Sequence, residues 1–161
     1  MDLLASAKTF VLQTPRSSIR GQTYAKLGSD NEKYTIGPFL APFGASSWDK
    51  RLSLDLDVGN AADELNAKLE ELTRPLGGEF KPIAKTSSYG TRLRVKLDDQ
   101  TKVWDHDKKS IGMELPEAIP IGSWASAVVR PYAWALSGRR GVTFHCEHVM
   151  LSKRPNDECP F

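Results

Sequence analysis

Apolar and polar residues alternate along much of the chain, and this period of two is typical of half-buried β-strands. The clearest example is residues 52–58, in which leucine or valine occupies every second position between serine and aspartate. Residues 23–25 and 34–39 show the same tendency more weakly, and a polar segment of turn-forming residues separates them. The pattern therefore predicts a chain built mainly from short strands.

Two hairpins are predicted in the second half of the chain. Residues 92–97 alternate and should turn back into residues 101–105, because acidic and amide turn formers separate the two segments. Residues 125–136 and 142–151 should form a second, longer hairpin across the glycine- and arginine-containing residues 137–141.

One segment has clear helical spacing. Leu65, Leu69 and Leu72 recur every three or four residues. Asn60 can cap this helix at its start, and Pro75 should end it. Short antiparallel strands with one mid-chain helix fit a small closed or partly open barrel, of which the oligonucleotide-binding (OB) barrel is the leading member. The predicted fold is therefore a mainly β OB barrel.

The length of 161 residues suits a single domain with a core of its own. We expect residues 1–154 to form the barrel and residues 155–161 to form an acidic C-terminal tip. No apolar stretch approaches the roughly 20 residues that span a bilayer, so no membrane partner is expected. The 2 cysteines are too few for a disulfide framework. The expected location is the cytoplasm, or the interior of a host cell if the protein is viral.

The net charge of +2 conceals an uneven distribution. Residues 1–84 carry 10 lysines and arginines against 11 aspartates and glutamates, whereas residues 85–154 carry 12 against 7. Residues 155–161 add two acids and no base. Positive charge is therefore concentrated in the second half, which permits a polyanionic partner.

A cation beside two aromatic residues is the first candidate binding feature. Arg130, Tyr132 and Trp134 share one face of an extended strand, because side chains alternate between the two faces. Aromatic rings can stack on bases of any sequence, and cations follow the phosphates. The alternative is that the two rings belong to the core, with the small residues opposite them facing outward. Val128 and Leu136, on the aromatic side, favour that alternative.

Further basic groups lie on neighbouring predicted hairpins. Together with the first set they form the expected nucleic-acid-binding residues: Arg92, Arg94, Lys96, Trp104, Arg130, Tyr132, Trp134, Arg139 and Arg140. Any one of these clusters alone is more often a solvated surface. Several basic sets on consecutive hairpins, interleaved with aromatic residues, favour binding to single-stranded nucleic acid.

Two other classes of function remain open. Asp55 and Asp57 lie two residues apart on one strand and could begin a divalent-metal site of a small nuclease or junction resolvase, with His106 between two further acids. Acids on the wet face of a strand are common, however, and we find no phosphate-cradling glycine motif or paired zinc motif. We therefore expect no enzyme activity, metal or cofactor. A structural protein associated with nucleic acid is the other alternative.

The end of the chain carries a short motif. Asp157, Glu158, Pro160 and Phe161 resemble the C-terminal tip of bacterial single-stranded-DNA-binding proteins, which ends in aspartates, an aliphatic residue, proline and phenylalanine. In that family the tip docks on replication and repair proteins, so the resemblance implies such partners here, with terminal-carboxylate capture as the mode of binding. That family also has a long linker before the tip, whereas only a few residues separate it from the predicted barrel here.

Residues 126–151 look like the C-terminal hairpin of small bacteriophage single-stranded-DNA-binding proteins. That resemblance implies a single OB barrel that binds single-stranded DNA in replication, recombination or repair. It is also compatible with a homo-oligomer. We therefore expect sequence-independent binding by base stacking and phosphate neutralisation.

Overall fold

The computed structural model describes residues 3, 10–13, 15–17, 21–28, 33–48, 51–82, 84–87, 90–105, 107, 109–110, 115 and 117–152. Its strands are β1 (Arg16–Ser17), β2 (Thr23–Lys26), β3 (Tyr34–Ala41), β4 (Ala45–Trp48), β5 (Arg51–Asp57), β6 (Glu79–Phe80), β7 (Ala84–Ser87), β8 (Gly90–Leu97), β9 (Lys102–Trp104), β10 (Ser123–Leu136) and β11 (Arg139–Ser152). Helix α2 (Ala61–Thr73) runs into the 3₁₀ turn η2 (Arg74–Leu76). Within these described residues, no helix is long and apolar enough to span a bilayer.

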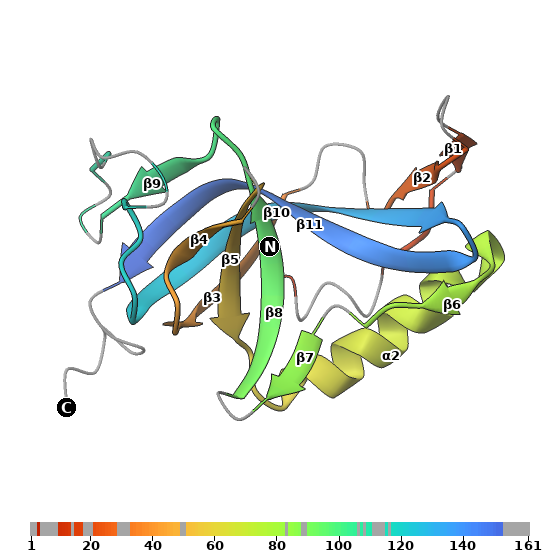
Figure 1. Ribbon diagram of the computed structural model, residues 1–161, viewed down its shortest axis with the longest axis horizontal. Helices are drawn as coiled ribbons and strands as arrows, with labels where there is room; N and C mark the ends of the chain where they lie inside the picture. The colour runs from red at the N-terminus through yellow and green to blue at the C-terminus, as the bar shows by residue number, and fades with distance from the viewer. Residues whose placement is uncertain are drawn as a thin grey trace.

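The long β10–β11 hairpin organises the sheet (Figure 1). One edge of β10 is shared by two strands, because β3 pairs with its first half and β2 with its second half. The outer edge of β11 pairs in parallel with β6, β8 and β9 in turn. β5 continues the sheet beyond β8, and β3 lies against β5. The sheet thus curves into the mainly antiparallel barrel that the sequence predicts, with the mid-chain helix α2 packed against it.

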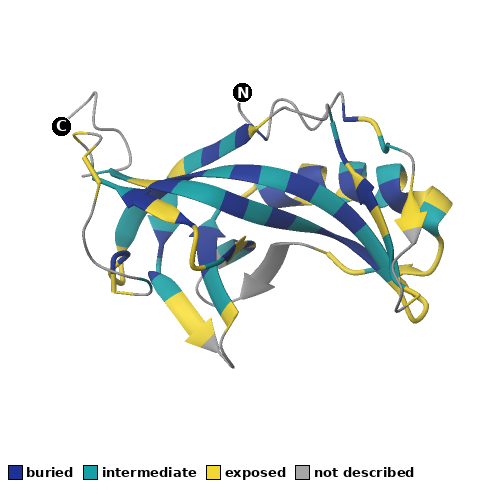
Figure 2. Ribbon diagram, turned by 90° about the horizontal axis from the view of Figure 1, so that it is seen from above, coloured by how far each residue is buried: buried dark blue, intermediate teal, exposed yellow. Residues whose placement is uncertain are grey.

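The core follows the alternation of each strand. Buried and half-buried residues form successive bands along the long strands (Figure 2). Leu54 and Leu56 of β5 and Leu93 and Val95 of β8 are fully buried, since β5 and β8 pair in register with their leucine faces inward. The strand predicted over residues 52–58 is therefore confirmed.

Helix α2 packs its apolar stripe onto β7, β8 and β11. Leu65 and Leu69 are buried along that stripe, and Leu72 packs against the core. The helix begins directly after Asn60 and ends before Pro75, as the sequence predicts. No side-chain hydrogen bond from Asn60 caps it.

The hairpin predicted between residues 92–97 and 101–105 is wrong. β8 pairs with β5 along one edge and with β7 and then β11 along the other, and β9 crosses to pair in parallel with β11. The turn itself exists, but the Thr101 hydroxyl donates to the Cys146 carbonyl and so directs the chain toward β11. Val103 is then buried opposite Val149. The chain therefore buries Val103 against β11 and does not form the predicted hairpin between residues 92–97 and 101–105.

The turn of the long hairpin is shorter than predicted. Ser137 and Gly138 form the whole turn, and both have positive φ angles of 52° and 78°. Two central residues with positive φ match the twist of the flanking strands, which is why this kind of two-residue turn is common in hairpins. Arg139 and Arg140 consequently belong to β11 and not to the tip.

Candidate nucleic-acid interface

One face of the β10–β11 hairpin points into the core and the other points outward. Ala127, Val129 and Ala133 are fully buried, whereas Tyr132 and Trp134, which flank Ala133, are only half-buried. The expectation that Tyr132 and Trp134 share a face is therefore confirmed, and that face is not the core. We call it the outer face. Across it the pairs Arg130–His145, Tyr132–Thr143 and Trp134–Gly141 face one another.

The outer face is hollowed into an open groove of about 540 Å³. Four adjacent strands contribute to it, because β2 flanks β10 and β8 flanks β11. Of the expected nucleic-acid-binding residues, Lys96, Tyr132 and Trp134 line the groove. The other lining residues are Gln22, Tyr24, Leu136, Thr143 and His145.

Tyr24 is a groove residue that the sequence reasoning missed. It lies on β2 directly opposite Trp134, and 43% of its surface is exposed. Its hydroxyl donates a hydrogen bond to the side-chain oxygen of Gln22 on the groove wall. The strand itself is predicted over residues 23–25, but its pairing with β10 is a non-local contact that alternation does not reveal. With Tyr132 and Trp134, it makes three aromatic rings in the groove.

Gly141 provides the floor under Trp134. A Cβ atom at this position would lie 2.7 Å from Cζ2 and 3.0 Å from Cε2 of the indole. The indole therefore lies against the bare backbone of the opposite strand, where glycine alone leaves room. This contact fixes the depth of the ring in the groove.

Two basic side chains line the groove, the exposed Lys96 and His145, which pairs with Asp98. Lys96 is exposed and lies opposite His145 in the β8–β11 pairing. Nε2 of His145 lies 2.9 Å from Oδ2 of Asp98, so the histidine is held by a carboxylate at the groove edge. Lys96 thus brings a positive charge beside the aromatic rings.

Arg92 and Arg94 lie on the same face of β8 as Lys96, as expected, but a carboxylate holds both. Arg94 Nε donates to Asp55 Oδ1 at 2.9 Å, and Arg92 Nη1 lies 3.4 Å from Oδ2. The hydrogen bond to Asp55 raises the pKa of Arg94. The Arg92 guanidinium also lies over the ring of Phe43, 4.8 Å from its centre. Arg94 keeps 69% of its side chain exposed, so it can still meet a phosphate.

This arrangement corrects the interpretation of Asp55 as an acid on a wet strand face. Its relative exposure is only 9%, because Arg94, directly opposite it on β8, and Arg92, two residues away on the same strand, both pair with its carboxylate. Asp57 lies two residues on and accepts a hydrogen bond from the Gly59 backbone. The described residues contain no group of three or more His, Cys, Asp or Glu side chains that could hold a metal ion. His106 lies outside the described residues.

Arg130 lies on the outer face beyond the groove and is paired with Glu147. Its Nε lies 2.6 Å from Glu147 Oε1, while Lys33 Nζ lies 2.9 Å from Oε2 of the same carboxylate. The hydrogen bond from Lys33 and the charge of Arg130 lower the pKa of Glu147. Glu147 is the extra residue at an irregularity opposite Val128 and Val129. Two cations and one acid therefore leave this cluster with net positive charge.

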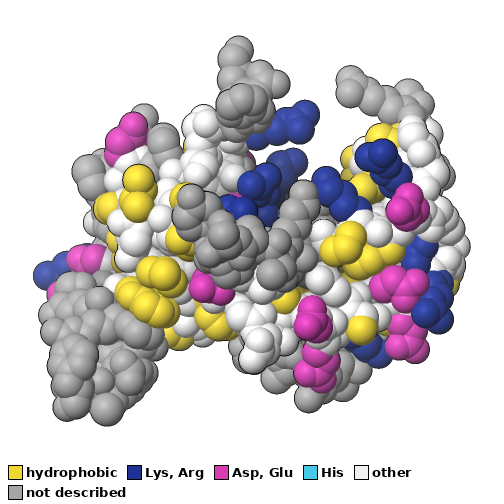
Figure 3. Space-filling model, turned by 60° about the horizontal axis from the view of Figure 1, so that its bottom comes forward, with side chains coloured by type: hydrophobic (Ala, Val, Ile, Leu, Met, Phe, Trp, Pro, Cys, Tyr) yellow, Lys and Arg dark blue, Asp and Glu magenta, His cyan; other side chains and the backbone are white. Residues whose placement is uncertain are grey.

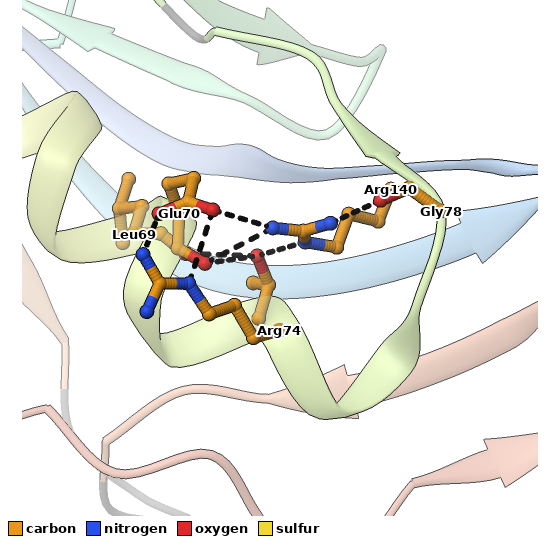
Figure 4. Close-up of polar contacts among 6 residues, drawn as sticks. Leu69, Glu70, Arg74, Gly78 and Arg140 are labelled. Carbon is orange, nitrogen blue, oxygen red and sulfur yellow. Dashed lines mark hydrogen bonds and ion pairs between the residues drawn. The ribbon is translucent and has the colours of Figure 1, made fainter.

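Arg140 does not point toward solvent, which corrects its expected role as a phosphate contact. Only 6% of its surface is exposed, and its guanidinium reaches the end of helix α2 (Figure 4). Nε donates to the Thr73 hydroxyl at 3.0 Å, and Nη2 lies 2.9 Å from Glu70 Oε1. Nη1 donates to the Gly78 carbonyl. The short turn is the physical reason, since it places Arg140 in the inward register of β11, whereas Arg139 is exposed.

Trp104 lies away from the groove. Its strand β9 pairs with the far end of β11, and its indole Nε1 donates to Nδ1 of His148 at 3.2 Å. The tip residues Asp157, Glu158, Pro160 and Phe161 lie outside the described residues.

On the face drawn in Figure 3, lysine and arginine side chains gather around a hollow at the upper rim, whereas most acidic side chains lie toward the right and below.

The fold is similar to two solved structures of phage proteins. One is gp2.5, a single-stranded DNA binding protein encoded by bacteriophage T7, with a TM-score of 0.51 and 15% identity over 74% of this chain and 85% of that chain. The other is the single-stranded DNA-binding protein from bacteriophage Enc34 in complex with ssDNA, with a TM-score of 0.51 and 14% identity over 88% of this chain and 96% of that chain. No protein-family model and no curated protein sequence matches the chain. At these identities the comparison establishes a shared fold, the OB barrel, and a fold alone does not fix a function.

Proposed function

We propose that this protein binds single-stranded DNA without sequence preference, in the groove on the outer face. The observation that carries the proposal is the convergence of Tyr24, Tyr132 and Trp134 beside the exposed Lys96. Stacking rings contribute about 1–3 kcal/mol per base and accept any base, and cations neutralise the backbone. A groove with these two components suits an unpaired strand, whose bases are free to stack.

The basic residues around the groove divide into two groups under this proposal. Lys96, Arg94 and Arg139 are exposed and would contact phosphates directly. Arg92 and Arg130 are half-buried and held by acids, so they would contribute positive potential more than direct contacts. The protein would act in replication, recombination or repair, and its acidic tip would recruit other proteins in those processes.

The proposal is tested by measuring affinity for single-stranded DNA, duplex DNA and RNA of equal length across a salt series. We expect single-stranded DNA to bind most tightly, with log affinity falling by about 0.7 per phosphate contact for each tenfold rise in salt. Replacing Tyr132 or Trp134 with alanine should weaken binding about 5- to 150-fold and leave the fold intact. An absence of binding at low salt would instead favour the alternative of a structural protein associated with nucleic acid.

The nuclease alternative requires the Asp55 carboxylate to be available to a metal ion. Asp55 already accepts hydrogen bonds from Arg92 and Arg94, which occupy both of its carboxylate oxygens. The same binding experiment, repeated with magnesium, tests this directly. Shortening of the DNA in the presence of magnesium would overturn the assignment of a purely binding function.

A further inference from the structure

The outer face of the β10–β11 hairpin continues well beyond the groove. Inward residues of β10 remain buried down to Ala125, and of the outward residues between them Arg130 and Val128 are half-buried, whereas Ser126 is buried. On β11 the extra residue Glu147 absorbs the irregularity, after which Val149 is buried and His148 and Met150 flank it on the outward side. One continuous surface therefore leads from the groove to the far end of the hairpin.

A second aromatic cluster lies at that far end. Trp104 is opposite Met150 in the β9–β11 pairing, and its ring centre lies 6.1 Å from that of His148 at a tilt of 41°. The hydrogen bond from the indole to His148 Nδ1 holds the two rings together. Met150 beside them is 36% exposed. We call Trp104, His148 and Met150 the distal cluster.

Cations lie along the surface between the groove and the distal cluster. Arg130 and Lys33 meet at Glu147 near the middle of the hairpin. Lys102 is exposed on the same side of β9 as Trp104, opposite His148. A DNA strand that leaves the groove toward the distal cluster would therefore run beside these cations and reach the ring of Trp104.

The separation of the two aromatic sites sets a length requirement. Trp134 and Ser126, which is opposite Met150, are about eight residues apart on β10, or about 27 Å at the usual strand rise. Nucleotides stacked at about 3.4 Å would need roughly eight units to cover this distance, and an extended strand would need fewer. This falls within the site size of about 4–16 nucleotides found for one OB fold.

We infer that the distal cluster is a second stacking site for the same DNA strand that occupies the groove. The inference rests on the proposed function and adds to it a subsite and a minimum length. A strand that spans both sites gains from Trp104, whereas a strand too short to span them occupies the groove alone.

The experiment compares Trp104→Ala and Trp134→Ala with the unchanged protein, using oligothymidylates of about 3 and about 16 nucleotides at low salt. Trp134→Ala should weaken binding of both lengths. Trp104→Ala should weaken binding of the long oligonucleotide about 5- to 150-fold and leave the short one within twofold. Trp104→Phe is the matched control, because it keeps a stacking ring and should retain most of the affinity.

Indole N–H resonances provide a second readout that does not depend on the stability of an alanine variant. The 4 tryptophans give separate signals that Trp→Phe variants assign. The long oligonucleotide should shift the signals of Trp134 and Trp104, and the short one that of Trp134. An unmoved Trp104 signal, or equal losses for both lengths in Trp104→Ala, would overturn the second site. If the unchanged protein binds neither oligonucleotide, the proposed function itself fails.

Discussion

Gly141→Ala is the substitution that tests the geometry of the groove most finely. The new methyl group would lie 2.7 Å from Cζ2 of Trp134, whereas carbon atoms in ordinary contact are about 3.5–4.0 Å apart. The indole must therefore rise from β11 by about 1 Å. Gly141 has no positive φ angle, so the backbone accepts alanine and the displaced ring is the main consequence.

The sizes of the expected effects differ between stability and binding. Alanine in a strand interior is favoured over glycine by about 0.5–1 kcal/mol, which offsets the cost of moving the ring. Stability should therefore change little. Complete loss of a stacking ring costs about 1–3 kcal/mol of binding, and a misplaced ring should lose part of it. We expect roughly a fivefold loss of affinity for single-stranded DNA, which is about 1 kcal/mol.

A double-mutant cycle separates this effect from any general one. Affinities of the unchanged protein, Gly141→Ala, Trp134→Ala and the double variant would be measured by fluorescence anisotropy of a labelled oligonucleotide, with urea unfolding of each. In the Trp134→Ala background, Gly141→Ala should have no further effect on affinity. The same loss in both backgrounds would refute the reasoning, because the methyl group would then act without the indole.

Four further predictions concern the charges and the tip. Arg139→Glu should weaken binding and flatten its salt dependence, which a salt titration checks. Arg140→Ala should lower the free energy of unfolding by about 1–3 kcal/mol, because it leaves the buried Thr73 hydroxyl oxygen without its donor; urea unfolding checks this. Glu147→Gln should raise affinity at low salt, because it releases Arg130 from its ion pair, and an unchanged affinity would place this cluster off the path of the DNA. Deletion of residues 157–161 should leave affinity equal or higher in a binding titration and abolish capture of a replication or repair protein, while a loss of thermal stability would show that the tip is structural.

Local patterns predict most of the elements of this fold. Strict alternation in residues 52–58 and leucine spacing in the helix are properties of single segments, and burial on one face follows from them directly. The pairing of β9 with β11 is different, since it depends on contacts between residues more than 40 positions apart, such as the bond from Thr101 to Cys146. Alternation shows which face of a strand is apolar, but it does not show which other strand pairs with it.

The errors in the candidate site have equally local causes. The assumption of a long turn at residues 137–141 placed Arg140 in solvent, although the dipeptide Ser137-Gly138 is itself a turn signal. A two-residue turn there sets the register, and Arg140 then faces inward and Gly141 lies opposite Trp134. The sequence does not predict Tyr24 as a groove residue, because nothing within its own short strand indicates that β10 lies beside it.

Single-stranded DNA is proposed to lie in the groove on the outer face of the barrel. Photocrosslinking of a halogenated deoxyuridine oligonucleotide, followed by peptide mapping, tests it most directly. We predict adducts on Tyr24, Tyr132 and Trp134, which duplex DNA of the same length does not produce. Adducts confined to peptides outside the outer face, such as helix α2, would contradict the claim.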